Sequence, residues 1–160
     1  TEGDLLWAFK RLCVMDLRQT EDHFISEILP RREIYFGIYD LKYAAKSGRI
    51  PTAAAFVGTA LNLKPVMRIF DKSITTAAKC RGERKLVEKV AQMSIEDMES
   101  GAPYEIVYGN DAGCLEELRR LMVLKLGYEP SAVYQIGAAV AANSGPRVVG
   151  VSFTIKSKIK

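Results

Sequence analysis

The sequence is poor in the residues from which metal centres, disulfide frameworks and catalytic triads are built. Its three cysteines, Cys13, Cys80 and Cys114, are an odd number at wide spacing, and no C-x-x-C pair occurs. Zinc sites and disulfide frameworks need patterned cysteines, so neither is supported, and a reducing compartment fits this usage best. The only histidine, His23, is expected on the polar face of a helix, with no nucleophile in a motif context. The sequence therefore gives no sign of catalytic or metal chemistry.

Signals for nucleotides, membranes and nucleic acids are missing as well. There is neither a P-loop nor a G-x-G-x-x-G turn, and no signal peptide is evident. The longest uncharged apolar run, Ile50 to Leu63, falls short of the ~20 residues that cross a bilayer. The net charge of +4 comes from scattered basic residues, dense only at Lys156, Lys158 and Lys160, which we expect to form a solvated tail. We therefore expect neither a membrane span nor a nucleic-acid partner.

The composition is that of an ordinary globular domain: 160 residues, 48% hydrophobic and 26% charged, are enough to bury a core. Hydrophobic periodicity and turn residues predict alternating helices and strands. Strands are expected over 33–39, 65–70, 74–80, 104–108, 133–138 and 148–155, and helices over 4–17, 20–29, 41–47, 52–63, 83–98 and 111–126, with Asn110 as the cap of the last helix and 142–147 as a loop. Because 65–70 and 74–80 form a hairpin, the predicted fold class is α/β, with a mixed β-sheet covered by α-helices.

Two arginines stand at helix ends where they suit an anionic ligand. Arg49 follows Gly48, the expected stop of a short helix capped by Asp40, and precedes a small-residue helix over 52–63. An arginine at the mouth of such a helix suits an anionic head with an apolar tail. Arg81 lies just before the helix that begins at Glu83, where helix amides and a guanidinium together can bind an anion. The alternatives are a capped turn before a core helix for the first and an ordinary surface cation for the second.

Several segments in order resemble one family. These segments are Tyr39-Asp-Leu-Lys-Tyr43, Ser47-Gly-Arg-Ile50, Leu61-Asn-Leu-Lys-Pro65, Lys79-Cys-Arg81 and Ser144-Gly-Pro146, the last of which precedes Val-Val-Gly-Val-Ser-Phe153. From about Ile34 to Phe153 the chain resembles the C-terminal half of the DegV family of bacterial fatty-acid-binding proteins. The resemblance implies a cytoplasmic, non-enzymatic, two-domain protein that holds one long-chain fatty acid between its halves, with no other cofactor and no metal, and presents its carboxylate to a fatty acid kinase.

The resemblance also divides the chain. It implies a helical lead-in over 1–32 from a missing N-terminal domain, a DegV C-terminal-like lipid-binding domain over 33–156 and a basic tail over 157–160. The family's N-terminal domain supplies an S-x-T-x-G carboxylate loop, and that motif does not occur in these 160 residues. We therefore expect this chain to hold the lipid tail without most of the head-group half.

By resemblance, the head group would lie near Arg49, Asn143 and Ser144, and Arg81 would face the kinase. The tail-lining candidates, each of which is otherwise explained as plain core, are Phe36, Ile50, Ala54, Phe56, Val57, Leu61, Leu63 and Val66. Two positions depart from the family. Asn143 stands where a histidine is common, and its amide can donate a hydrogen bond but cannot carry charge. Arg147 stands where a small residue is usual.

Two further functions stay open at this point. The chain could be a structural or regulatory module, fused to another domain, that never holds lipid. It could also belong to an enzyme whose active site lies outside these residues.

Overall fold

Six strands form one mixed sheet in the computed structural model, which describes residues 26, 29–48, 62–71 and 73–156. The strands are β1 (Arg32–Ile38), β2 (Leu63–Phe70), β3 (Ser73–Arg81), β4 (Tyr104–Tyr108), β5 (Ala132–Gln135) and β6 (Val148–Thr154). Their order across the sheet is β3-β2-β1-β6-β4-β5. All neighbours are antiparallel except β4 and β5, which are parallel and connected through a helix. The first and last described strands are thus neighbours at the centre of the sheet.

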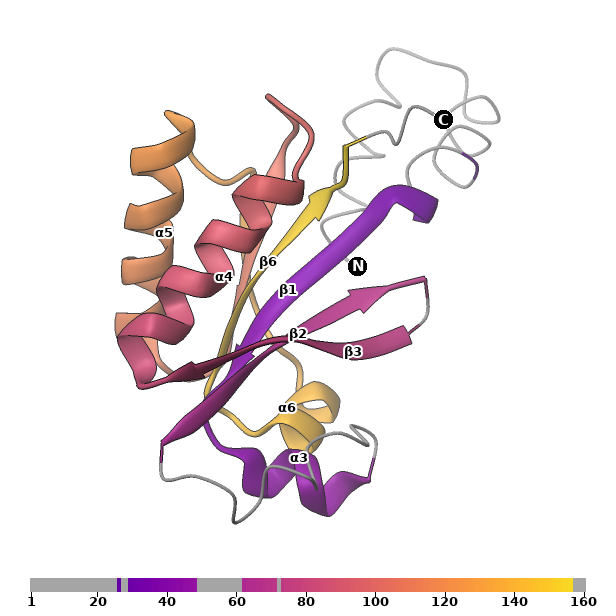
Figure 1. The fold of residues 1–160 in the computed structure, drawn as a ribbon, viewed down its shortest axis with the longest axis vertical. Coiled ribbons are helices and arrows are strands. Elements are labelled where there is room, and N and C mark those ends of the chain that lie inside the picture. The colour runs from indigo at the N-terminus through magenta and orange to yellow at the C-terminus, as the bar shows by residue number, and fades with distance from the viewer. Residues whose placement is uncertain (1–25, 27–28, 49–61, 72, 157–160) are drawn as a thin grey trace.

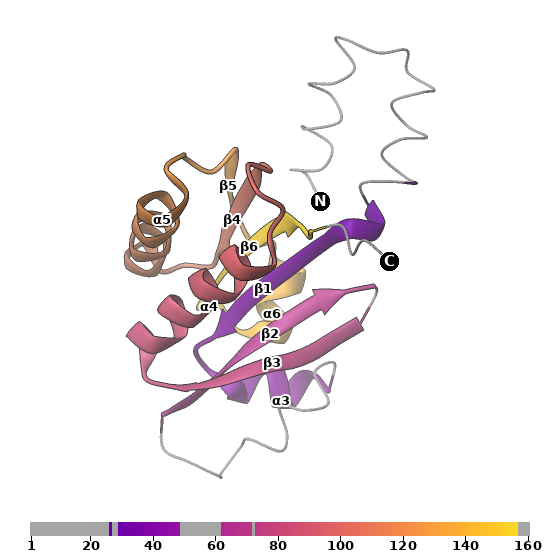
Figure 2. The ribbon, with the colours of Figure 1, turned by 45° about the horizontal axis from the view of Figure 1, so that its top comes forward.

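Helices cover both faces of this sheet. They are α3 (Leu41–Ser47), α4 (Glu83–Asp97), α5 (Ala112–Leu126) and α6 (Ala138–Ser144), and a short 3-10 helix, η2 (Leu29–Arg31), precedes β1. The longer pair, α4 and α5, packs on one face, whereas α3 and α6 lie together on the opposite face, at the end where β1 stops and β6 begins (Figures 1 and 2). The sheet is therefore the middle layer of three.

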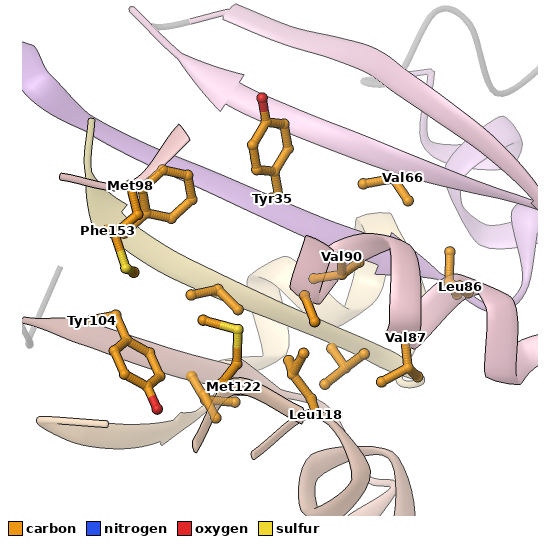
Figure 3. Close-up of a cluster of buried hydrophobic side chains, with 14 of the residues drawn as sticks. Tyr35, Val66, Leu86, Val87, Val90, Met98, Tyr104, Leu118, Met122 and Phe153 are labelled. Atoms are coloured by element: carbon orange, nitrogen blue, oxygen red, sulfur yellow. The ribbon is translucent and has the colours of Figure 1, made fainter. Parts of the chain in front are cut away.

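The larger core lies between the sheet and the α4–α5 layer. Tyr35, Leu86, Val90, Leu118 and Phe153 are among its buried side chains, which come from both helices and the central strands (Figure 3). Gly37 permits the close approach of α4, because a Cβ at this position would lie 2.6 Å from Leu86 Cγ. This layer has the features of ordinary packed core.

A smaller core lies on the opposite face, beneath α3. Phe36, Ile38, Ala44 and Met67 are buried in it, and Ile34, Leu41 and Ile69 pack against it while only partly buried. Strand alternation places Phe36 and Met67 on this face because the two residues pair across β1 and β2. We call this group the Phe36 cluster.

The predicted fold class is confirmed, and five of the six predicted strands agree with the structure to within two residues. The strand predicted over 133–138 is instead β5, which ends at Gln135. The loop predicted over 142–147 was wrong for its first part, because α6 runs from Ala138 to Ser144 between Gly137 and Gly145. Seven small or apolar residues carry too little periodicity to separate helix from strand.

The cap of α5 also differs from the prediction. Asp111, and not Asn110, accepts hydrogen bonds from the amides of Gly113 and Cys114, while Gly127 ends the helix in the left-handed region, at φ 81°. Aspartate and asparagine are equally good caps, so sequence alone could not choose between two adjacent candidates. The helices predicted over 4–17 and 52–63, most of that over 20–29, and the 157–160 tail lie outside the described residues.

Candidate functional site

The C-terminal ends of α3 and α6 meet at one corner of the molecule. Ser47 Oγ donates to the carbonyl of Ala44 at 3.0 Å and lies 3.5 Å from the carbonyl of Asn143. The ring of Tyr43 lies against Gly145, where a Cβ would come within 3.0 Å of Cδ2. We call Tyr43, Ser47, Asn143, Ser144 and Gly145 the α3–α6 corner. The end of α3, just before the head-group candidate Arg49, therefore lies beside the head-group candidates Asn143 and Ser144, although the two segments are about a hundred residues apart in the chain.

The polar side chains of this corner differ in what they can offer a ligand. Asn143 Nδ2 donates to the carbonyl of Ala139 at 2.7 Å, which leaves its second N–H available. Ser144 is buried, and its single hydroxyl proton has two backbone acceptors, the carbonyls of Val140 at 2.9 Å and Gly145 at 3.1 Å. An incoming carboxylate would therefore find its hydrogen-bond donor at Asn143 and not at Ser144.

The chain after the corner is fixed to the end of β4. The amide of Asn110 donates to the carbonyl of Pro146 at 2.8 Å, and the amide of Gly109 donates to that of Val148 at 2.9 Å. A Cβ on Gly109 would lie only 1.8 Å from the Pro146 carbonyl oxygen, so the close contact requires glycine. The Ser-Gly-Pro segment is thus held by backbone contacts as well as by α6.

Arg147 is the centre of a charged cluster on the α4–α5 side of this segment. Its guanidinium donates to both Glu83 oxygens, at 2.9 and 3.0 Å, and to Asp111 Oδ2 from two nitrogens, at 3.1 and 2.7 Å. The same group lies 4.7 Å from the centre of the Tyr39 ring. The guanidinium holds the pKa of both the Glu83 and the Asp111 carboxyl below its ordinary value. Glu83, Asp111, Arg147 and Tyr39 are called the Arg147 cluster below.

Beside this cluster lies an open pocket of about 600 Å³. Tyr39, Asp111 and Cys114 are among its lining residues, and Glu83 and Arg120 flank it. The Tyr39 hydroxyl is buried and makes no hydrogen bond of ordinary geometry among the described residues. Burial raises its pKa, and its interaction with the Cys114 thiol raises it further. Burial also raises the pKa of the Cys114 thiol, so this cysteine is a poor nucleophile at neutral pH. Sequence reasoning missed this pocket, because its residues are scattered along the chain.

The tail-lining candidates that the structure describes do not share one face of the sheet. Phe36 belongs to the cluster beneath α3, and alternation along β2 places Leu63 on the same face as Met67. Val66 pairs with Gly37 and is fully buried beneath α4 with the larger core (Figure 3). One acyl chain on the α3 side can contact Phe36 and Leu63, but not Val66. Arg49, Ile50, Ala54, Phe56, Val57 and Leu61 lie outside the described residues.

Arg81 is exposed at the end of β3, which is an edge strand of the sheet. It lines a groove of about 470 Å³ together with Lys79, Lys85 and Lys89. Glu88 is the one carboxylate among the lining residues of this groove. The spacing could have indicated this basic groove, because Lys79 and Arg81 are two apart on a strand and Lys85 and Lys89 are four apart on a helix. The sequence interpretation singled out Arg81 but did not group it with these three lysines.

Two kinds of feature are absent from the described part of the chain. Across those residues, no group of three or more His, Cys, Asp or Glu side chains is placed to hold a metal ion. None of the helices described there is long and apolar enough to cross a membrane.

The geometry defines this protein as a three-layer α/β domain that has a polar corner next to an apolar cluster. The family model described as "Uncharacterised protein, DegV family" matches residues 19–156. The chain therefore belongs to the DegV family, which confirms the resemblance in the sequence.

Curated relatives agree with this assignment. The DegV domain-containing protein YteA of Lactococcus lactis is 27% identical over 136 residues, which cover 84% of this chain and 47% of that protein. The DegV domain-containing protein CPE2509 of Clostridium perfringens is 33% identical over 129 residues, which cover 76% of this chain and 45% of that protein. The chain thus spans about half the length of the curated relatives it matches.

Solved structures share the fold. A stearic acid-binding protein from Eubacterium ventriosum superposes with a TM-score of 0.81 at 22% identity, over 95% of this chain and 54% of that chain. A DegV family protein from Corynebacterium glutamicum gives a TM-score of 0.80 at 26% identity, over 98% of this chain and 60% of that chain. A DegV family protein from Eubacterium eligens, loaded with heptadecanoic acid, gives a TM-score of 0.81 at 14% identity, over 97% of this chain and 56% of that chain.

Proposed function

We propose that this chain forms part of a binding site for a long-chain fatty acid, with the carboxylate at the α3–α6 corner and the tail along the Phe36 cluster. The observation that carries the proposal is the position of the two groups. Both lie on the α3 side of the sheet, and α3 contributes to each, because its Ala44 is buried in the cluster and its Ser47 lies in the corner, 3.5 Å from the carbonyl of Asn143. Relatives of the same fold are described as binding stearic acid and heptadecanoic acid.

The physical basis is a division of labour between these two groups. An acyl chain gains roughly 0.8 kcal/mol for each CH₂ group removed from water, so the apolar surface supplies most of the affinity. Ile34 and Ile69 are only partly buried beside the cluster, and they offer apolar surface for such contact. Tyr43 on α3 and Val140 on α6 are 44% and 53% exposed, so the two helices that form the corner offer apolar surface as well. The second N–H of Asn143 would orient the carboxylate.

The whole protein's activity is proposed on the same basis. The site would be completed by a second domain of the kind that makes up the rest of the relatives, and Arg49 would contribute to the head-group side. The protein would be a cytoplasmic carrier without catalytic residues or a cofactor beyond the fatty acid. The exposed basic groove around Arg81 would be the surface that meets an acidic region of a fatty acid kinase.

The head-group assignment is tested by two adjacent substitutions in the full-length protein. We expect Asn143→Ala to raise the Kd for palmitate about tenfold, because it removes a hydrogen bond to a charged group. We expect Ser144→Ala to change it less than about threefold, because its hydroxyl proton is already engaged by backbone carbonyls. Titration of labelled palmitate measures both. Equal losses, or a loss only at Ser144, would contradict the assignment.

The tail assignment is tested by a matched pair on opposite faces of the sheet. Both Phe36→Ala and Val66→Ala remove buried apolar side chains and should lower stability. Only Phe36→Ala should also weaken palmitate binding, measured at a temperature where both variants are folded. Wild-type protein that retains no fatty acid in native mass spectrometry, and binds none on titration, would instead favour the structural or regulatory module.

A further inference from the structure

Arg147 joins the end of the corner segment to three other elements. It lies three residues after Ser144, and its guanidinium contacts Glu83 at the start of α4, Asp111 at the cap of α5 and the ring of Tyr39 after β1. We propose that Arg147 is a positioning residue that holds the α3–α6 corner in the geometry needed to bind a carboxylate. This inference rests on the fatty-acid site proposed above.

The contacts fix Arg147 from several directions. The planar guanidinium makes a two-pronged contact with Glu83 and a second contact with Asp111, so both its position and its plane are set. Its backbone carbonyl also accepts from the amide of Tyr39 at 3.3 Å. A lysine could keep the charge, but it could not reproduce the fork. The start of β6 is therefore locked to the N-terminal ends of both long helices.

Asp111 makes this arrangement cooperative. Its Oδ1 accepts from the amides of Gly113 and Cys114 while its Oδ2 accepts from Arg147. The carboxylate that caps α5 is thus the same one that anchors the chain after the corner. α4 has no side-chain cap, because its N-cap residue is Gly82. The link between Arg147 and the start of α4 is therefore made through Glu83. A shift of Arg147 would be felt at both helices.

Arg147 acts through geometry because its charge is already neutralised. The negative charges of Glu83 and Asp111 lie against the guanidinium. With Lys64, whose Nζ lies 3.8 Å from Glu83, the net charge of these four side chains is zero. The guanidinium packs on Tyr39 and between two carboxylates, so it offers little field to a fatty-acid carboxylate at the corner. The effect on a ligand must pass through the backbone of Ser144, Gly145 and Pro146. That distinction makes the proposal testable.

The test compares palmitate with hexadecanol, which keeps the tail and lacks the carboxylate, on the full-length protein. We expect Arg147→Ala to raise the Kd for palmitate about tenfold and the Kd for hexadecanol less than about twofold. Arg147→Lys should fall between wild type and Arg147→Ala for palmitate. Arg119→Ala, which removes an exposed arginine paired with Glu129, is the control and should change neither value.

A second readout needs no ligand. The amides of Gly109 and Asn110 bond to the carbonyls of Val148 and Pro146, and they should exchange with solvent at least about fivefold faster in Arg147→Ala than in wild type. Amides in the centre of β1 should not change. Glu83→Gln, which weakens one anchor and spares the α5 cap, provides a milder variant if Arg147→Ala does not fold, and it should raise the palmitate Kd about threefold.

The outcomes separate the two ideas. If wild type binds neither lipid, the proposed function fails, and the exchange rates at Gly109 and Asn110 still decide whether Arg147 positions the corner. If wild type binds palmitate and Arg147→Ala or Glu83→Gln weakens both lipids equally, or neither, then Arg147 supports only general packing and the inference is overturned.

Discussion

Asp111 performs two tasks with two oxygens, and substitutions can separate them. Oδ1 caps α5 at 3.1 and 3.2 Å from two amides, and Oδ2 meets Arg147 at 2.7 Å. Asp111→Ala removes both interactions, whereas Asp111→Asn keeps a good N-cap and loses the carboxylate charge. The difference between the two variants therefore measures the cap, and the effect of Asp111→Asn measures the ion pair.

The magnitudes follow from the exposure of these groups. Loss of an N-cap costs about 1 kcal/mol. The Arg147 and Asp111 side chains are 40% and 26% exposed, so we discount their ion pair to ~0.5–1 kcal/mol. Arg147 keeps Glu83 as a partner in either variant, so no charge is left uncompensated. We expect a loss of about 1.5–2 kcal/mol for Asp111→Ala and about 0.5–1 kcal/mol for Asp111→Asn.

Urea unfolding at pH 7, followed by far-UV circular dichroism, measures these changes. In an Arg147→Ala background, Asp111→Asn should cost less than about 0.3 kcal/mol, because its partner is gone. The reasoning would be refuted if Asp111→Asn were as damaging as Asp111→Ala, or if the loss in Asp111→Asn persisted without Arg147.

Three further predictions concern backbone contact, a buried hydroxyl and pH. Gly109→Ala should cost more than about 3 kcal/mol, because its Cβ would meet the Pro146 carbonyl at 1.8 Å, whereas Gly137→Ala, with nothing within 4 Å, should cost less than about 0.5 kcal/mol in the same unfolding assay. Tyr39→Phe should change the melting temperature little, because the hydroxyl makes no hydrogen bond of ordinary geometry and has only the weakly accepting Cys114 thiol beside it. Tyr35→Phe loses a 2.6 Å hydrogen bond to Asp97 and should cost about 1 kcal/mol, and an equal loss at Tyr39 would contradict this reasoning. Because Arg147 lowers the pKa of Glu83 and Asp111 in the folded protein, their contribution is complete above the unfolded values near about 4 and is lost as pH falls through the folded values. Unfolding midpoints measured from pH 6 downward should therefore fall less steeply in Arg147→Ala than in wild type, and parallel curves would contradict this linkage.

The sequence predicted correctly those helices and strands that have a regular apolar pattern and recognisable capping or turn residues at their ends. The isoleucines and phenylalanine at Ile34, Phe36 and Ile38 recur every second residue, which predicted β1, and Asp40 and Gly48 cap and end α3 as expected. The helix α6 was missed because its short run of small residues is equally compatible with a strand or a turn. Its fold is decided by packing on α3, which local sequence does not encode.

The site was less predictable than the fold because it depends on pairing register. Alternation shows that Phe36 and its neighbours point to two faces, but only the pairing of Val66 with Gly37 places Val66 beneath α4. The Arg147 cluster likewise joins residues 39, 83, 111 and 147, which no local window contains. Family resemblance identified the Ser-Gly-Pro segment and marked Arg147 as unusual, yet it said nothing of its partners.

The central place of β6 has a consequence for how the protein is made. Strands β1, β2 and β3 form one side of the sheet and β4 and β5 the other, and β6 pairs with β1 and β4 to join them. Because β6 is the last described strand to leave the ribosome, the inner edges of both sides stay unpaired until translation has passed Thr154. Such open edges attract other strands, so nascent chains that stall before Val148 should need chaperone protection and aggregate without it.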